Sequence, residues 1–136
     1  MRGILWLTVL VALAGGPARG ADDLILGQDT YNGACAACHG IEPGLQGPMA
    51  EFLNIPVPDL TRISARNGGE FPWLKVVHIV DGRTGLRGHG GAMPVFGTIF
   101  RGDTVAVDGP DGTPVIASER VLAVVAYLQS LQTNAP

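Results

Sequence analysis

The only two cysteines of this chain lie three residues apart, in the segment Cys35-Ala36-Ala37-Cys38-His39. Four kinds of chemistry suit two thiols beside a histidine: a disulfide, a dithiol redox switch, part of a zinc site, or covalent attachment of a haem. A disulfide across so short a turn is strained and easily reduced, which suits redox chemistry better than stabilisation. The choice among the four therefore depends on the rest of the sequence.

The dithiol switch and the zinc site both lack the sequence context that they need. A thioredoxin-like CxxC follows a buried strand, whereas the residues before Cys35 are polar and have a helical pattern. Zinc needs four ligands, so His78 and His89 would have to join the two cysteines, and neither has a paired ligand at zinc-like spacing. We therefore favour the haem interpretation over both.

Covalent haem attachment uses every residue of the segment. Side chains at positions i and i+3 of a helical turn lie on one face, so Cys35 and Cys38 can each bond one vinyl group of a haem. His39 follows directly and can bind the iron, while the two small alanines leave room for the ring. The pattern predicts one haem c, held through Cys35 and Cys38 with His39 as an axial ligand.

A second axial ligand is expected from a loop farther along the chain. Met93 follows Gly90-Gly91-Ala92 and precedes Pro94, and such a loop can bring a thioether sulfur close to a flat ring. Histidine and methionine together fill both axial positions, which is an electron-transfer arrangement. The alternative ligands are His89, which a glycine-rich loop also carries, and the less suitable His78 and Met49. We expect Met49 to be a core residue and His78 to pack in its helix.

Periodicity and turn residues predict the elements that position these side chains. Helices are expected over 22–34, 35–39, 49–54, 60–66, 73–80 and 119–132, an extended segment over 56–60, and a hairpin with strands 104–107 and 113–117. Asp59 and Ser118 are the expected caps of the helices that follow them. The expected aliphatic core is Val76, Val77, Ile79, Val80, Leu122, Val125 and Leu128.

The first twenty residues have the layout of a secretory signal peptide. Arg2 precedes a short apolar run, and small residues precede a cleavage position between Gly20 and Ala21. Without residues 1–20 the chain has seven basic and twelve acidic residues, a formal charge of −5. This charge does not suit nucleic acid and is consistent with a partner that presents a basic patch.

With these features the sequence resembles a known family, the small class I monohaem cytochromes c of bacterial periplasms. The resemblance covers the region 21–136 and is carried by the CxxCH motif and by four further features. Gly47-Pro48 matches the family's Gly-Pro, whose proline supports the proximal histidine, and Met93-Pro94 matches the pair that carries the distal ligand. Gly27 and Tyr31 resemble the glycine and aromatic residue of the family's first helix, and Tyr127 resembles the aromatic residue of its last helix.

The resemblance implies an all-α fold of few helices and long loops wrapped around one haem. The small β-hairpin insert at 104–117 departs from the family, since the smallest members are short there. The resemblance also implies a monomeric periplasmic electron carrier, not an enzyme, with Cys35, Cys38, His39 and Met93 as cofactor-binding residues. Its partners would be a membrane or periplasmic dehydrogenase and a terminal oxidase or reductase. The alternatives are a dedicated cytochrome subunit of such an enzyme, or a haem sensor with an open or His-ligated iron. Trp73 and Tyr127 are expected wall residues of the haem site. The candidate donors to the haem propionates are Arg62, Arg66, Arg83 and Arg87.

Overall fold

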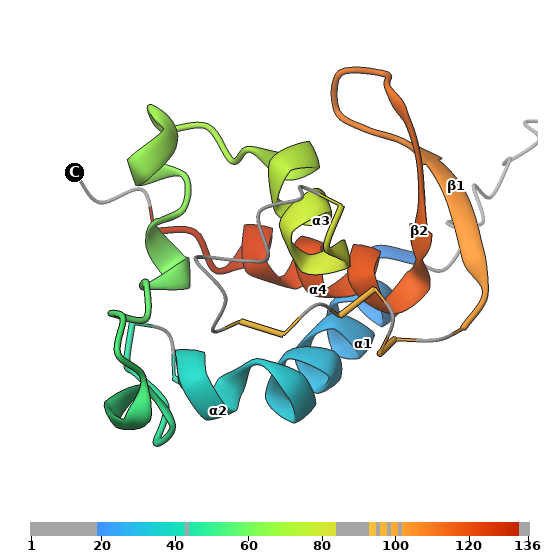
Figure 1. Ribbon diagram of the computed structural model, residues 1–136. Coiled ribbons are helices and arrows are strands. Elements are labelled where there is room, and N and C mark those ends of the chain that lie inside the picture. Colours follow the sequence, from blue (N-terminus) through green and yellow to red (C-terminus); the bar gives the residue numbers. More distant parts are fainter. Residues whose placement is uncertain are drawn as a thin grey trace, which may run out of the picture.

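A computed structural model describes residues 19–42, 44–83, 93–94, 96–97, 99–100 and 102–133. The α-helices in it are α1 (Arg19–Ala34), α2 (Ala36–His39), α3 (Trp73–Asp81) and α4 (Glu119–Ser130). Short 3₁₀ turns are η1 (Ala50–Phe52), η2 (Leu60–Arg62) and η3 (Ala65–Asn67), and the strands are β1 (Thr104–Asp108) and β2 (Pro114–Ser118). The fold is therefore mostly helical with a small antiparallel hairpin, as expected (Figure 1).

The predicted N-terminal cleavage position lies at the beginning of α1, between Gly20 and Ala21. Residues 1–18, which carry most of the predicted signal peptide, lie outside the described residues. In the part of the chain that the structure describes, no helix is long and apolar enough to cross a membrane.

The fold is organised by a close crossing of α1 and α4 (Figure 1). A side chain at Gly27 would collide with the carbonyl of Ala123 and come within 2.8 Å of the Cβ atom of Tyr127. Glycine at this position therefore lets the two helix backbones touch. One turn on, the rings of Tyr31 and Tyr127 pack with their centroids 5.5 Å apart. The resemblance placed Gly27 and Tyr31 on the first helix and Tyr127 on the last, and the two helices cross at these residues.

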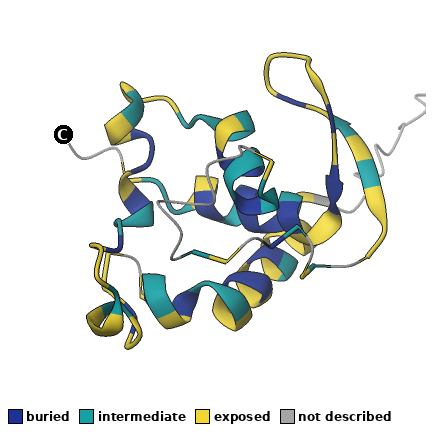
Figure 2. Cartoon of the chain, viewed as in Figure 1, coloured by how far each residue is buried: buried dark blue, intermediate teal, exposed yellow. Residues whose placement is uncertain are grey.

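The hydrophobic core lies between α1, α3, α4 and β2 (Figure 2). Its most deeply buried side chains are Val77, Val121, Val124 and Val125. The expected core residues Val76, Val77, Val80, Val125 and Leu128 are buried. Ile79 and Leu122 were also expected in the core and are only partly buried, because they lie at the margins of the buried faces of α3 and α4.

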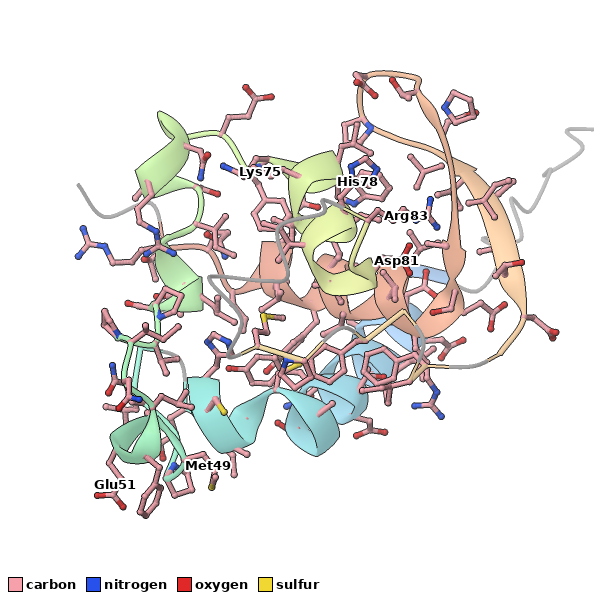
Figure 3. All side chains as sticks on the ribbon, in the orientation of Figure 1. Met49, Glu51, Lys75, His78, Asp81 and Arg83 are labelled. Atoms are coloured by element: carbon pink, nitrogen blue, oxygen red, sulfur yellow. The ribbon has the colours of Figure 1, made fainter. Side chains whose placement is uncertain are left out.

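The hairpin has the expected position and is fixed to α3. Its register runs from Thr104 opposite Ser118 to Asp108 opposite Pro114. Arg83, just after α3, pairs with Asp81 and donates a hydrogen bond to the carbonyl of Ile116 on β2 (Figure 3). Ser118 then ends the strand and caps α4, since its hydroxyl accepts a hydrogen bond from the amide of Val121 at 3.3 Å.

The helix predicted over 60–66 is replaced by the two separate turns η2 and η3. An α-helix would join the carbonyl of Leu60 to the amide of Ser64. Gln132 takes both groups instead: its amide nitrogen donates to Leu60 at 2.8 Å and its oxygen accepts from Ser64 at 2.9 Å. The prediction of one helix was wrong because a side chain beyond α4 satisfies this backbone. Asp59 caps η2 as expected.

Candidate functional site

One cavity, of about 240 Å³, brings together the four residues for which the sequence predicted chemistry. Cys35, Cys38 and His39 line it from the α1–α2 side, and Met93 lines it from the loop after α3. The remaining wall residues are mostly apolar: Ala34, Ala37, Leu53, Ile55, Pro56, Val57, Pro58, Pro94 and Phe96. A thioether, an imidazole and two thiols thus face one apolar space.

Helical backbone geometry places the two thiols side by side. The amide of Cys35 donates to the carbonyl of Tyr31 at 2.8 Å, and that of His39 donates to Cys35 at 2.9 Å. The chain therefore continues through the motif with nearly helical spacing, which brings Cys35 and Cys38 to the same face. Gly40 ends the turn with φ = 85°, a left-handed conformation that favours glycine.

The loop after the motif returns and binds the end of α2. The amide of Gly47 donates to Cys38 at 2.9 Å, and that of Met49 donates to Ala37 at 2.8 Å. These bonds satisfy carbonyls that a helix end leaves without intrahelical partners. A side chain at Gly47 would collide with the carbonyls of Ala36 and Ala37, so only glycine allows this approach.

The half-buried imidazole of His39 is oriented by the segment before η2. Its Nδ1 atom lies 3.3 Å from the carbonyl oxygen of Pro58. A carbonyl only accepts hydrogen bonds, so this contact requires the proton on Nδ1 and leaves a lone pair on Nε2, as a metal-binding histidine needs. The resemblance assigned this support to Pro48. In the structure the carbonyl of Pro58 contacts His39, while Pro48 is exposed and lies between Gly47 and Met49 in the loop that binds α2.

Met93 is partly buried and packs against the core at the cavity. The chain after it is fixed to α3, because the amide of Phe96 donates to the carbonyl of Val80 at 3.1 Å. Phe96 also stacks on Phe100 with ring centroids 5.1 Å apart. Gly97 lies so close to Asp81 that a side chain there would collide with it. Phe96 was not predicted as a wall residue of the cavity. Its position soon after Met93-Pro94 was the available signal.

A comparison with protein-family models matches most of the sequence to one family. The family model for cytochrome c matches residues 24–132. The chain belongs to the cytochrome c family. Comparisons with curated proteins and with solved structures found no significant match. Family membership makes the chain a haem-binding electron-transfer protein, and its two cysteines have the CxxCH spacing of covalent attachment.

The cavity of this cytochrome fits a haem in its donor set and in the apolarity of its walls. Imidazole nitrogen and methionine sulfur are suitable axial ligands for haem iron. The segment from Leu53 to Pro58 supplies most of the apolar wall, and Phe96 adds an aromatic side chain. The sequence predicts an extended segment over 56–60; in the structure residues 56–59 lie outside any helix, whereas Leu60 begins η2. The place of this segment beside the cavity was not predicted.

The Cys35 thiol does not have the properties of a redox-switch nucleophile. Burial raises the pKa of the Cys35 thiol to about 11, and the neighbouring Cys38 acts in the same direction. A redox-active cysteine needs the opposite shift, because the thiolate is the nucleophile. A neutral, partly buried thiol at Cys35 is instead suited to reaction with an apolar vinyl group beside it.

Several expected site residues of the cytochrome lie elsewhere. Met49 was expected in the core but is 47% exposed and points away from the body of the protein (Figure 3). Trp73 and Tyr127 do not line the cavity: Trp73 lines a groove beside the hairpin and Tyr127 packs on Tyr31. His78 lies on α3 and is not a wall residue either.

The arginines expected near the haem have other positions. Arg62 and Arg66 do not line the cavity, and Arg66 donates to the carbonyl of Asp59 at 2.8 Å. Arg83 binds Asp81 and Ile116. Arg87 and the alternative ligand His89 lie outside the described residues. Within the described ranges, no group of three or more His, Cys, Asp or Glu side chains is arranged to hold a metal ion.

Proposed function

We propose that this chain is an exported carrier of single electrons with one covalently bound haem c. Cys35 and Cys38 would form the two thioether bonds, and His39 and Met93 would be the axial ligands. The observation that carries the proposal is the shared cavity, in which residues from distant parts of the sequence face one apolar space. Membership of the cytochrome c family supports the cofactor.

The bound haem would supply one-electron exchange between ferrous and ferric iron. The residues of the chain act by holding the same geometry in both states. Pro58 keeps the proton of His39 on Nδ1, and the bond from Phe96 to Val80 anchors the loop that carries Met93. The apolar wall excludes water and favours the less charged, reduced state. With both axial positions filled, no substrate reaches the iron, so the protein would not be an enzyme.

The predicted signal peptide and the charge of the remaining chain support the location and the partners of this carrier. A segment such as 1–20 would direct secretion and supports a location in the periplasm, where haem c is attached in bacteria. There it would act as a monomer between a membrane or periplasmic dehydrogenase and a terminal oxidase or reductase. Its acidic surface would favour partners with a basic contact region.

An absorption spectrum of the chain, produced in a host that attaches haem in its periplasm, tests the proposed function. We expect sharp haem c bands after reduction and a weak far-red sulfur-to-iron band in the oxidised protein. The haem should remain with the polypeptide in acidified organic solvent, because thioether bonds are covalent. Fast carbon monoxide binding to the reduced protein would instead indicate a sensor with an open iron. A protein without haem and with two free thiols would refute the proposal.

A further inference from the structure

Four large apolar side chains are exposed together in the segment after α2. Ile41 is 72% exposed, Leu45 59% and Phe52 70%, and Met49 is the fourth. We call these four residues the apolar face. None of them lines the cofactor cavity, so a bound haem is not expected to cover them. Ile55 is left out because it lines that cavity. Two of them, Ile41 and Leu45, line a common groove. Several exposed apolar side chains within one short segment point to an interaction site.

The apolar face begins at the haem-attachment motif. A groove of about 420 Å³ lies beside α2 and is lined by Ala36, Ala37, Ile41, Leu45 and Pro48, among others. Ala37, between the two cysteines, lines both this groove and the cofactor cavity. A molecule that covers the groove would therefore sit directly beside the covalently attached edge of the haem.

The exposure of this face is fixed by the backbone. The bond from Met49 to Ala37 holds the loop on α2, and the amide of Leu53 donates to Ala50 at 3.2 Å at the end of η1. Met49 and Glu51 consequently point outward from the edge of the molecule (Figure 3). Figure 2 shows that the turn they belong to is largely exposed. The apolar side chains are thus displayed on a structured surface.

The segment that carries the apolar face has formal charges of a single sign. Residues 20–61 contain no lysine or arginine and six acidic residues. Of these, Glu42 and Glu51 belong to the segment of the apolar face and are exposed. All seven basic residues outside the first twenty lie after residue 61. The formally charged side chains that adjoin the apolar face within residues 20–61 are therefore all acidic.

We propose that the apolar face binds a redox-partner protein whose contact region has an apolar centre and a rim of lysine and arginine. The proposal rests on the proposed function and names the partner's chemistry. Burial of the apolar side chains provides affinity, while the basic rim pairs with Glu42 and Glu51 and orients the encounter. A second copy of the chain is disfavoured, because its own face would place the same carboxylates opposite each other. An anionic membrane is disfavoured for the same reason.

Gold electrodes coated with defined monolayers can represent this partner. We would compare the haem-loaded full chain on a mixed methyl- and ammonium-terminated monolayer, an ammonium-only monolayer, and a mixed methyl- and carboxylate-terminated one. We expect the mixed cationic surface to adsorb the protein most strongly and to exchange electrons with it fastest. Ile41→Ser and Phe52→Ser should each weaken adsorption there about tenfold, since each removes a large apolar contact.

The control variants separate this face from general surface effects. Ile116→Ser makes the same change at a 58% exposed isoleucine on β2 and should leave adsorption unchanged. Glu51→Lys should slow adsorption most at low salt, whereas Glu70→Lys, at an exposed site before α3, should do so much less. Equal adsorption on all three surfaces, or equal losses from Ile41→Ser and Ile116→Ser, would refute the proposal.

Two further measurements distinguish the other occupants and the proposed function itself. Sedimentation that shows a dimer abolished by Ile41→Ser would assign the face to a second copy. Binding of the wild-type protein to phosphatidylcholine or phosphatidylglycerol vesicles, lost in Phe52→Ser, would assign it to a membrane. Either result overturns the proposal. A solution titration with small mediators tests the haem couple independently, so a reversible couple without surface preference refutes only the docking proposal.

Discussion

The hydroxyl of Tyr31 on α1 donates a buried hydrogen bond of 2.8 Å to the carbonyl of Gly40, the residue directly after His39. The same ring packs on Tyr127 of α4. Tyr31 therefore connects the helix crossing to the end of the haem-attachment motif. Burial raises the pKa of its hydroxyl to about 12, and nearby Cys35 adds to the shift. The phenol stays protonated at neutral pH and can donate this bond.

Tyr31→Phe should destabilise the protein without removing the ring from the core. The change leaves the buried carbonyl of Gly40 without this donor, so we expect the free energy of unfolding to fall by about 1–3 kcal/mol. Chemical denaturation of the haem-loaded protein measures the loss. Tyr127→Phe, which keeps the ring contact with Tyr31, is the matched control. If both variants lost the same stability, the bond to Gly40 would not be the cause.

Gly27→Ala and Gly33→Ala should have opposite effects although both lie on α1. A methyl group at Gly27 collides with the backbone of Ala123, so α1 and α4 must move apart, at a cost of about 3 kcal/mol. Nothing lies within 4 Å of a methyl group at Gly33. There the better helix propensity of alanine should stabilise the protein by about 0.5 kcal/mol. Thermal unfolding of the two variants gives the comparison, and a tolerant Gly27→Ala would contradict the close crossing.

Met93→Ala should abolish the far-red sulfur-to-iron band and allow carbon monoxide to bind the reduced haem. The reason is that Met93 lines the cofactor cavity whereas Met49 is exposed outside it. Met49→Ala is therefore the control and should keep the band. Absorption spectra of both oxidised variants decide the matter. Retention of the band in Met93→Ala would show that another side chain supplies the sulfur ligand.

Asp59 should make the stability of the protein depend on pH at the acidic end. The Thr61 hydroxyl donates a hydrogen bond of 2.7 Å to Oδ1 of Asp59. This bond holds the pKa of the Asp59 carboxyl below its ordinary value of 3.8, and the bond from the amide of Thr61 adds to the effect. The folded state therefore favours the ionised form. Its stabilising contribution is present above the ordinary pKa and is lost as pH falls through the lower, folded-state pKa.

Asp59→Asn should flatten this part of the stability profile, because the substituted side chain has no charge to lose. Urea denaturation of the haem-loaded wild type and variant between about pH 6 and about pH 3 gives the comparison. Glu70→Gln, at an exposed site, should leave the slope as in the wild type. An unchanged slope in Asp59→Asn would indicate that other carboxyls account for the acid dependence.

The sequence by itself determined the features that depend on neighbouring residues. The spacing of Cys35 and Cys38 on one turn, the caps at Asp59 and Ser118, and the hairpin around 108–112 all follow from local backbone preferences and short-range hydrogen bonds. The helical spacing of apolar residues likewise indicated most of the buried faces of α3 and α4. These features could be predicted because their interactions join residues only a few positions apart.

Only the tertiary structure decided which distant groups meet. Gln132 divides the predicted helix over 60–66 by binding Leu60 and Ser64, and no pattern within that segment shows it. Pro58 rather than Pro48 supports His39. Met49 is exposed rather than buried, because the loop after α2 folds back onto Ala37. The meeting of Met93 with the cysteines in one cavity was a prediction that depended on the whole fold. Such contacts depend on how complete elements pack, which residue types and spacing alone do not specify.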